Sequence, residues 1–176
     1  RSSAASDVYK RQELADRIFY LTAKTITATV AKETFALLEK NGYRAKTIQI
    51  TAKEKLCPCD EMECNPVTCP YAKGHFDRVN DAVFDLLHRC EMIERDDILL
   101  QADRYTVCPF ELCLDTASWC DNVICDYNYV FDPNVYLKRF FQEGIKGDYI
   151  FLIDEAHNMV ERSRQMYSCL LYTSPS

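Results

Sequence analysis

Residues 149–153 (Tyr-Ile-Phe-Leu-Ile) form an unbroken apolar run, and this run restricts the fold more than any other feature of the chain. A strand with one face in water alternates apolar and polar side chains, whereas an unbroken run fits a parallel strand covered on both faces. We therefore expect residues 149–153 to form a central strand of a parallel sheet. Asp154 and Glu155 follow directly, so two carboxylates should lie where this strand ends.

Three further short segments have the composition of strands. Residues 17–22 are rich in aromatic and β-branched side chains, residues 45–51 alternate, and residues 123–125 are apolar. Strands that alternate with helices imply crossover connections and a parallel sheet. One sheet should therefore contain strands near residues 18–21, 46–50, 123–126 and 149–153.

Helical spacing of apolar residues separates these strands. It predicts a helix over 27–42 that stops at Asn41-Gly42, a second helix with an apolar stripe between 79 and 87, and a third helix that begins at Asp132-Pro133 and runs to Phe141. Residues 57–72 interrupt the alternation. The predicted fold class is α/β, a parallel sheet flanked by helices, with a cysteine-rich insertion.

The acidic residues after the last strand have the pattern of a nucleotide-hydrolysing site. In open α/β sheets the chemistry lies beyond the carboxyl ends of the strands, where Asp154, Glu155 and His157 fall. In nucleoside triphosphatases the first carboxylate holds Mg²⁺ and the second orients or deprotonates the attacking water, so Asp154 and Glu155 are the candidates. A neighbouring histidine can hydrogen-bond across such a site. The competing interpretation is an exposed turn that caps the next helix.

Ten cysteines in 176 residues are a second unusual feature, and four of them crowd together at Cys57, Cys59, Cys64 and Cys69. Secreted disulfide scaffolds are usually short and rich in loops, whereas this chain has long helical patterns, so we favour metal binding. An iron–sulfur cluster and a structural zinc site both use four thiolates. The spacing alone leaves both open. We expect Cys90, Cys113, Cys120 and Cys125 to pack as small apolar groups.

The bulk properties fit a globular domain. The net charge of −6 argues against a nucleic-acid binder that is basic over its whole surface, but it allows a local basic groove. No apolar run approaches the length of a membrane span, and the start does not have the layout of a signal peptide. Residues 1–12 and 168–176 fit neither neighbouring pattern, and we expect both to be non-native tails.

Several segments together resemble one family. Asp-Glu-Ala-His at 154–157 resembles the Walker B (DEAH) motif of superfamily 2 helicases, and other motifs narrow the resemblance to the iron–sulfur DNA helicases similar to XPD and DinG, in particular the DinG-like bacterial type. The motifs are "FYLTAKT" (19–25), "ITAKEKLC" (50–57), "CNPVTCPYAKGHFDRVNDAV" (64–83), "CPFELCLD" (108–115) and "VICDYNYVFDP" (123–133). The resemblance covers residues 13 to 167.

This resemblance implies a RecA-like motor domain interrupted by a cluster subdomain. It assigns residues 13–56 to the first part of motor domain 1, 57–110 to the iron–sulfur insertion, and 111–167 to the continuation of the motor domain. It further implies ATP-dependent unwinding of single-stranded or forked DNA in the bacterial cytoplasm, by a protein that we expect to be a monomer. None of the four glycines begins a Gly-x4-Gly-Lys-Ser/Thr phosphate loop. In this family that loop precedes residue 13, so we expect a fragment of motor domain 1 that is inactive alone.

The same resemblance assigns roles to individual residues. It implies [4Fe–4S] ligation by Cys57, Cys64, Cys69 and Cys108, with Cys59 as an extra thiol that could replace one of them. It implies DNA-phosphate contacts from Thr22, Lys24 and Thr25, Mg²⁺ at Asp154, and ATP as the substrate. Lys73, His75 and Arg78 fit either a strand-separation channel or a solvated helix face. The alternative function is a non-enzymatic zinc-binding module whose acidic turn is structural.

Overall fold

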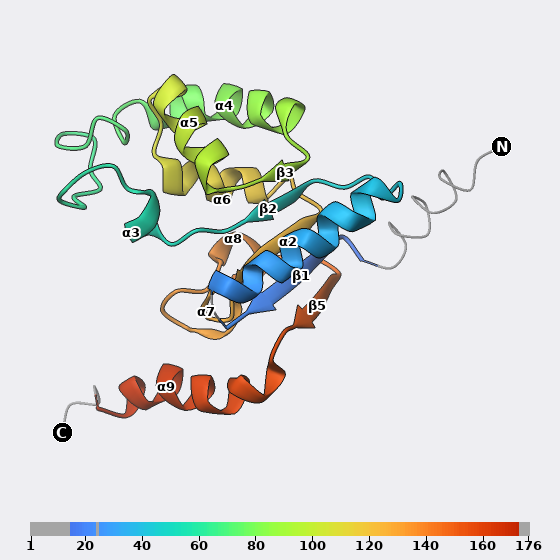
Figure 1. Ribbon diagram of the computed structural model, residues 1–176. Helices are drawn as coiled ribbons and strands as arrows, with labels where there is room; N and C mark the ends of the chain where they lie inside the picture. The colour runs from blue at the N-terminus through green and yellow to red at the C-terminus, as the bar shows by residue number, and fades with distance from the viewer. Residues whose placement is uncertain (1–14, 24, 173–176) are drawn as a thin grey trace. The chain divides into compact units, whose positions relative to one another are not determined.

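The computed structural model describes residues 15–23 and 25–172 (Figure 1), and for residues 25–27 and 169–172 it describes the backbone only. The predicted tail 1–12 therefore lies outside the described residues, as do residues 173–176 of the predicted tail 168–176. Among the described residues, no helix combines the length and apolar character needed to cross a bilayer.

The strands form one five-stranded parallel sheet in the order β3-β2-β4-β1-β5. In the sheet β1 pairs with β5, so that Arg17 lies opposite Tyr149 and Leu21 opposite Ile153, and β2 pairs with β3. The prediction of one shared sheet is confirmed. The strands are β1 (Arg17–Thr22), β2 (Thr47–Gln49), β3 (Met92–Ile93), β4 (Asn122–Asp126) and β5 (Tyr149–Ile153).

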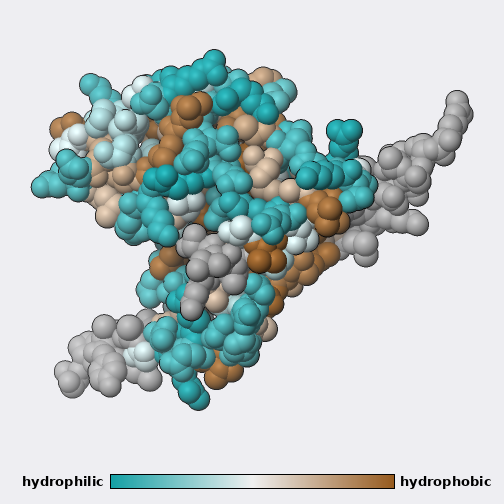
Figure 2. Space-filling model, in the orientation of Figure 1, coloured by the Kyte–Doolittle hydropathy of each residue, from teal (hydrophilic) through white to brown (hydrophobic). Residues whose placement is uncertain are grey.

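The position predicted for the last strand is wrong. Among the described strands β5 lies at the end of the sheet, with β1 as its neighbour. Its side chains from Ile150 to Ile153 are 39–44% exposed, and Figure 2 shows hydrophobic surface in the region where Figure 1 places β5. The unbroken apolar run identified a parallel strand correctly, but no described strand pairs with its second edge.

The chain divides into two compact units, one formed by residues 1–42 and 124–176 and the other by residues 43–123. The second unit includes more residues at both ends than the predicted cysteine-rich insertion 57–110. The first unit contains β1, β5 and α2 (Thr25–Lys40), followed by shorter elements and a last helix: α7 (Asn128–Phe131), α8 (Lys138–Phe141), η1 (Ala156–Asn158) and α9 (Met159–Tyr172).

Aromatic rings form the centre of the first unit. Phe19 of β1 is fully buried, and its ring lies 5.1–5.5 Å from four other rings, those of Phe140, Phe141, Tyr149 and Phe151. Helix α2 packs on β1 with its apolar face, and the ring of Phe35 lies 6.3 Å from that of Tyr20. The predicted helix stop is confirmed, because α2 ends at Lys40 and Gly42 has a φ of 95°.

The helix predicted from Asp132 to Phe141 is mostly wrong. The Asp132 carboxylate accepts the Asn134 backbone N–H at 2.8 Å, and the Leu137 N–H is donated to the Tyr129 carbonyl at 2.8 Å. The first bond is also the one that a helix N-cap makes, but the Leu137 N–H is donated to Tyr129 and not to the Pro133 carbonyl four residues earlier, so the helical pattern does not continue. Only α8 at the end of this segment is helical.

The second unit is a group of three helices beside short strands. Helices α4 (His75–Arg89), α5 (Arg95–Tyr105) and α6 (Pro109–Ala117) pack against one another, and α3 (Lys53–Leu56) contacts α6. The predicted apolar stripe lies on the buried face of α4, with Val79, Ala82, Val83 and Leu86 all at most 6% exposed. Helix α5 was not predicted, because charged residues dominate it; it begins with a capping box between Glu94 and Asp97.

Candidate functional sites: an acidic turn and a cysteine cavity

The backbone at Asp154 is fixed at the carboxyl end of β5 by two hydrogen bonds within the first unit. Its N–H is donated to the Leu21 carbonyl of β1 at 2.9 Å, and its carbonyl accepts the hydroxyl of Tyr127. The tyrosine N–H is in turn donated to the Thr22 carbonyl at 3.3 Å. The ends of β1, β4 and β5 therefore meet at Asp154, whose side chain is half-buried.

Glu155 turns the chain away from the strand. It has a φ of 50° and a ψ of 44°, a left-handed conformation that L-residues adopt at a cost. Its Oε2 lies 3.3 Å from Nδ1 of His157, and both side chains are exposed, by 49% and 74% respectively. The turn thus presents a carboxylate to solvent with an imidazole beside it.

Three residues that sequence reasoning did not assign to this site support the turn. The Arg162 guanidinium of α9 donates to the Ala23 carbonyl at 3.0 Å and to the Asp126 carboxylate at 3.3 Å, at the ends of β1 and β4. Burial, together with the carboxylates of Asp154 and Glu155, raises the pKa of Tyr127, which keeps its phenol protonated as a donor. A signal was available: Asp126 directly follows the predicted strand 123–125.

The residues predicted to contact DNA have unequal outcomes. Thr22 is 4% exposed, so its side chain lies in the interior of the first unit and does not present its hydroxyl at the surface. Lys24 lies outside the described residues. Thr25 begins α2, and the structure describes only its backbone.

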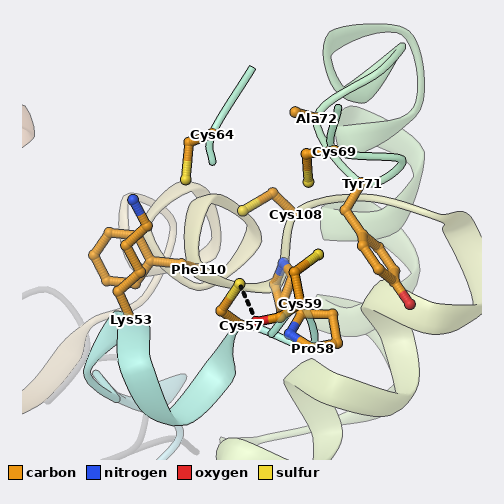
Figure 3. A pocket seen from close by; sticks show the side chains of 11 residues that line it. Lys53, Cys57, Pro58, Cys59, Cys64, Cys69, Tyr71, Ala72, Cys108 and Phe110 are labelled. Atoms are coloured by element: carbon orange, nitrogen blue, oxygen red, sulfur yellow. Dashed lines mark hydrogen bonds between the residues drawn. The ribbon is translucent and has the colours of Figure 1, made fainter. Parts of the chain in front are cut away.

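The predicted cluster cysteines come together in the second unit. Cys57, Cys64, Cys69 and Cys108 line one cavity that opens to solvent, and the extra thiol of Cys59 lines it too. Figure 3 shows these five sulfurs facing a common space. Cys108, separated from Cys69 by 38 residues, is therefore close to the other thiols as the predicted ligand set requires.

Local structure explains how each cysteine reaches the cavity. Cys57 is the C-cap of α3, and Cys108 is the N-cap of α6, where Pro109 occupies the first helical position. Between Cys64 and Cys69 the Asn65 carboxamide oxygen accepts the backbone N–H groups of residues 67 and 68 at 2.9 and 3.0 Å. This tight turn lets two thiols five positions apart line the same cavity.

A lysine lies among the thiols. A hydrogen bond to Cys64, reinforced by the charges that Cys108 and Cys57 can carry, raises the pKa of Lys53 against the opposing effect of partial burial. Desolvation, with hydrogen bonds to Cys69 and Cys57, raises the pKa of Cys59 to about 11. Desolvation also raises the pKa of Cys108. Without a bound cation, the cavity therefore favours neutral thiols at Cys59 and Cys108.

Two residues considered for a DNA channel have structural partners instead. His75 is 4% exposed. Arg78 donates to the carbonyls of Tyr105 and Thr106 at 2.8 and 2.6 Å and to the Lys73 carbonyl at 2.8 Å. Both side chains make contacts within the unit, and the channel interpretation stays a prediction.

The remaining cysteines mostly behave as predicted. Cys113, Cys120 and Cys125 are at most 2% exposed, whereas Cys90 is half-buried. Within the described part of the chain, no three His, Cys, Asp or Glu side chains converge as the ligands of a single metal ion would. The donor chemistry of the cavity nonetheless fits an iron–sulfur cluster, because thiolates hold such clusters and five thiols are available for four positions.

Comparison with known proteins places the chain in a family. Residues 27–174 match the family model of DEAD_2. The chain is 31% identical over 108 residues to the "General transcription and DNA repair factor IIH helicase subunit XPD/RAD3" of Saccharomyces cerevisiae, an alignment that covers 61% of this chain and 13% of that protein. It is 29% identical over 73 residues to the "Fanconi anemia group J protein homolog" of Gallus gallus, covering 42% of this chain and 6% of that protein. The chain thus spans only a small part of these relatives.

Proposed function

Because this chain belongs to the DEAD_2 family, we propose that it is part of an ATP-dependent DNA helicase of the iron–sulfur type. The observation that carries the proposal is the acidic turn at the carboxyl end of β5 in a parallel sheet, where open α/β sheets place their ligands. The yeast relative is itself named as a helicase subunit. The DinG-like bacterial type is a finer proposal that rests on the sequence motifs.

Each residue of the turn has a separate role in this proposal. Asp154, with its backbone fixed by β1 and Tyr127, would bind Mg²⁺, which neutralises charge on the nucleotide phosphates. Glu155 extends into solvent and would orient or deprotonate the attacking water. His157, 3.3 Å from Glu155, would hold that carboxylate in place. DNA contacts at Thr22, Lys24 and Thr25 remain part of the proposal, and a contact at Thr22 would require its 4% exposed surface to open.

The cysteine cavity would hold the [4Fe–4S] cluster. Cys57, Cys64, Cys69 and Cys108 would supply one thiolate each, and Cys59 would remain as a fifth thiol beside them. Lys53 would offset part of the negative charge of the four thiolates. The same thiols could bind zinc, so the competing proposal is a zinc module with a structural acidic turn.

The nucleotide proposal is tested in the whole protein that contains this chain. Glu155→Gln should nearly abolish DNA-stimulated ATP hydrolysis and leave nucleotide binding intact, because the amide keeps the shape of the side chain but cannot accept the proton. A matched Glu161→Gln change, on exposed α9, should leave hydrolysis unchanged. Normal turnover of the Glu155→Gln protein would remove Glu155 from the mechanism.

The cluster proposal is tested by anaerobic purification. We expect about four iron and four acid-labile sulfide per chain, with the visible absorption of an iron–sulfur centre. A colourless protein that contains stoichiometric zinc would favour the competing module. If the protein binds neither iron nor zinc after anaerobic reconstitution, both the cluster and the zinc assignment of the cavity are refuted.

A further inference from the structure

His75 forms a hydrogen bond that links it to one predicted cluster ligand. It is the first residue of α4, and its Nδ1 lies 3.2 Å from the backbone N–H of Cys108. A backbone N–H can only donate, so Nδ1 must be the acceptor and the ring proton must lie on Nε2. Because His75 is only 4% exposed, water does not readily replace this hydrogen bond.

The other side of the ring faces a carboxylate. Nε2 has no hydrogen-bond partner among the described residues, and Oδ2 of Asp115 lies 3.8 Å from it. A buried N–H without a partner costs free energy, so packing alone would favour an apolar side chain here. The Asp115 carboxylate favours the tautomer with the proton on Nε2, which is the tautomer that accepts from Cys108.

We propose that His75 is a positioning residue that fixes the Cys108 backbone at the rim of the cysteine cavity. This inference rests on the proposed role of the cysteines as cluster ligands. Cys57, Cys64 and Cys69 lie within one short segment, whereas Cys108 can reach them only through tertiary contacts. His75 supplies such a contact from the first turn of α4, which directly follows the segment of the other thiols.

A second side chain of α4, Arg78, also bonds to the segment before Cys108. Arg78, one turn along α4, donates to the carbonyls of Tyr105 and Thr106, three and two positions before Cys108. Its third bond, to the Lys73 carbonyl, reaches back to the segment that carries Cys69. Together the two side chains hold residues 105–108 against the start of α4, so that Cys108 has a fixed place relative to the other thiols.

The test uses two substitutions that replace different ring nitrogens. His75→Asn puts an amide oxygen close to the position of Nδ1 and keeps the acceptor for Cys108, whereas His75→Gln reaches toward the position of Nε2 and removes it. Each protein is reconstituted anaerobically with ferrous iron and sulfide, and release of iron to a chelator is timed. We expect His75→Asn to stay within about twofold of the unsubstituted chain and His75→Gln to release iron about tenfold faster, the factor of one lost buried hydrogen bond.

A second measurement does not depend on the metal. In the metal-free chain, amide hydrogen exchange at Cys108 should be slow in the unsubstituted and His75→Asn proteins and at least tenfold faster in the His75→Gln protein. Equal rates of iron release and of Cys108 exchange in the unsubstituted protein and both variants would overturn the inference. Equal acceleration of both rates in the His75→Asn and His75→Gln proteins would overturn it as well. If the unsubstituted chain takes up no iron, the cluster proposal fails, while the exchange pattern still decides whether His75 holds Cys108.

Discussion

The left-handed backbone of Glu155 predicts that the acidic turn is strained, and this can be measured. A residue with a Cβ at a φ of 50° crowds the neighbouring carbonyl, which costs about 1–2 kcal/mol, whereas glycine adopts this conformation freely. We compare Glu155→Gly with Glu155→Ala. Both changes remove the carboxylate and its ion pair with His157, so their difference reports the backbone alone.

The expected difference follows from two opposing effects. Relief of the crowding favours the glycine protein by about 1–2 kcal/mol, and the greater freedom of glycine in the unfolded chain takes back about 0.4–1 kcal/mol. The glycine protein should therefore be more stable than the alanine protein by about 0.5–1 kcal/mol. For a chain of this length that difference raises Tm by about 1–4 °C, which differential scanning calorimetry can measure.

Thr106 provides the matched control. Among the described residues other than glycine, Thr106 and Glu155 are the two with a positive φ, and that of Thr106 is 52°. Thr106→Gly should exceed Thr106→Ala in stability by a similar amount, and Thr106 belongs to the other unit. An alanine protein at position 155 that equals or exceeds the glycine protein would refute the strain at Glu155. If the strain is present, the turn sacrifices stability to present a carboxylate where glycine would be the relaxed residue.

Three further predictions concern the second unit. Cys59→Ser should keep the iron content of the unsubstituted chain, whereas Cys108→Ser should lower it severely, as measured by iron and sulfide analysis. Lys53→Gln should speed iron release to a chelator several-fold, since it removes the ammonium beside the thiols. A hydrogen bond from Gln101, assisted by nearby arginines, lowers the pKa of Asp85 below its usual 3.8. The ionised Asp85 carboxylate therefore contributes folding stability that is fully present above its usual pKa and is lost as the pH falls through the lowered pKa. Asp85→Asn should reduce this loss of stability at acid pH, as measured by denaturation curves recorded by circular dichroism.

The sequence was informative wherever one local pattern determines the structure. The apolar runs located β1, β4 and β5 but not the two-residue strand β3, and the carboxylates after residue 153 located the acidic turn at the carboxyl edge of the sheet. Spacing along the chain also identified the buried stripe of α4, because periodicity reports which face of a helix is covered. These features depend on neighbours in the sequence.

The features that escaped prediction depend on partners distant in the sequence. The bond between His75 and Cys108 joins residues 33 positions apart, and neither residue type announces it. The position of β5 within the sheet depends on which strands are its neighbours, which an apolar run cannot specify. Asp132 and Pro133 were compatible with both a helix start and a turn, and the bond from the Leu137 N–H to the Tyr129 carbonyl prevents the helix from continuing.

The exposed strand β5 has a consequence for handling this chain in solution. Its four residues Ile150–Ile153 each remain about 40% exposed, and no described strand occupies its second edge. An apolar edge with free backbone donors and acceptors is a template for further strand pairing. The isolated chain should therefore self-associate as its concentration rises, and a single charge introduced on β5, such as Leu152→Lys, should improve its solubility more than the same change at exposed Leu100 of α5.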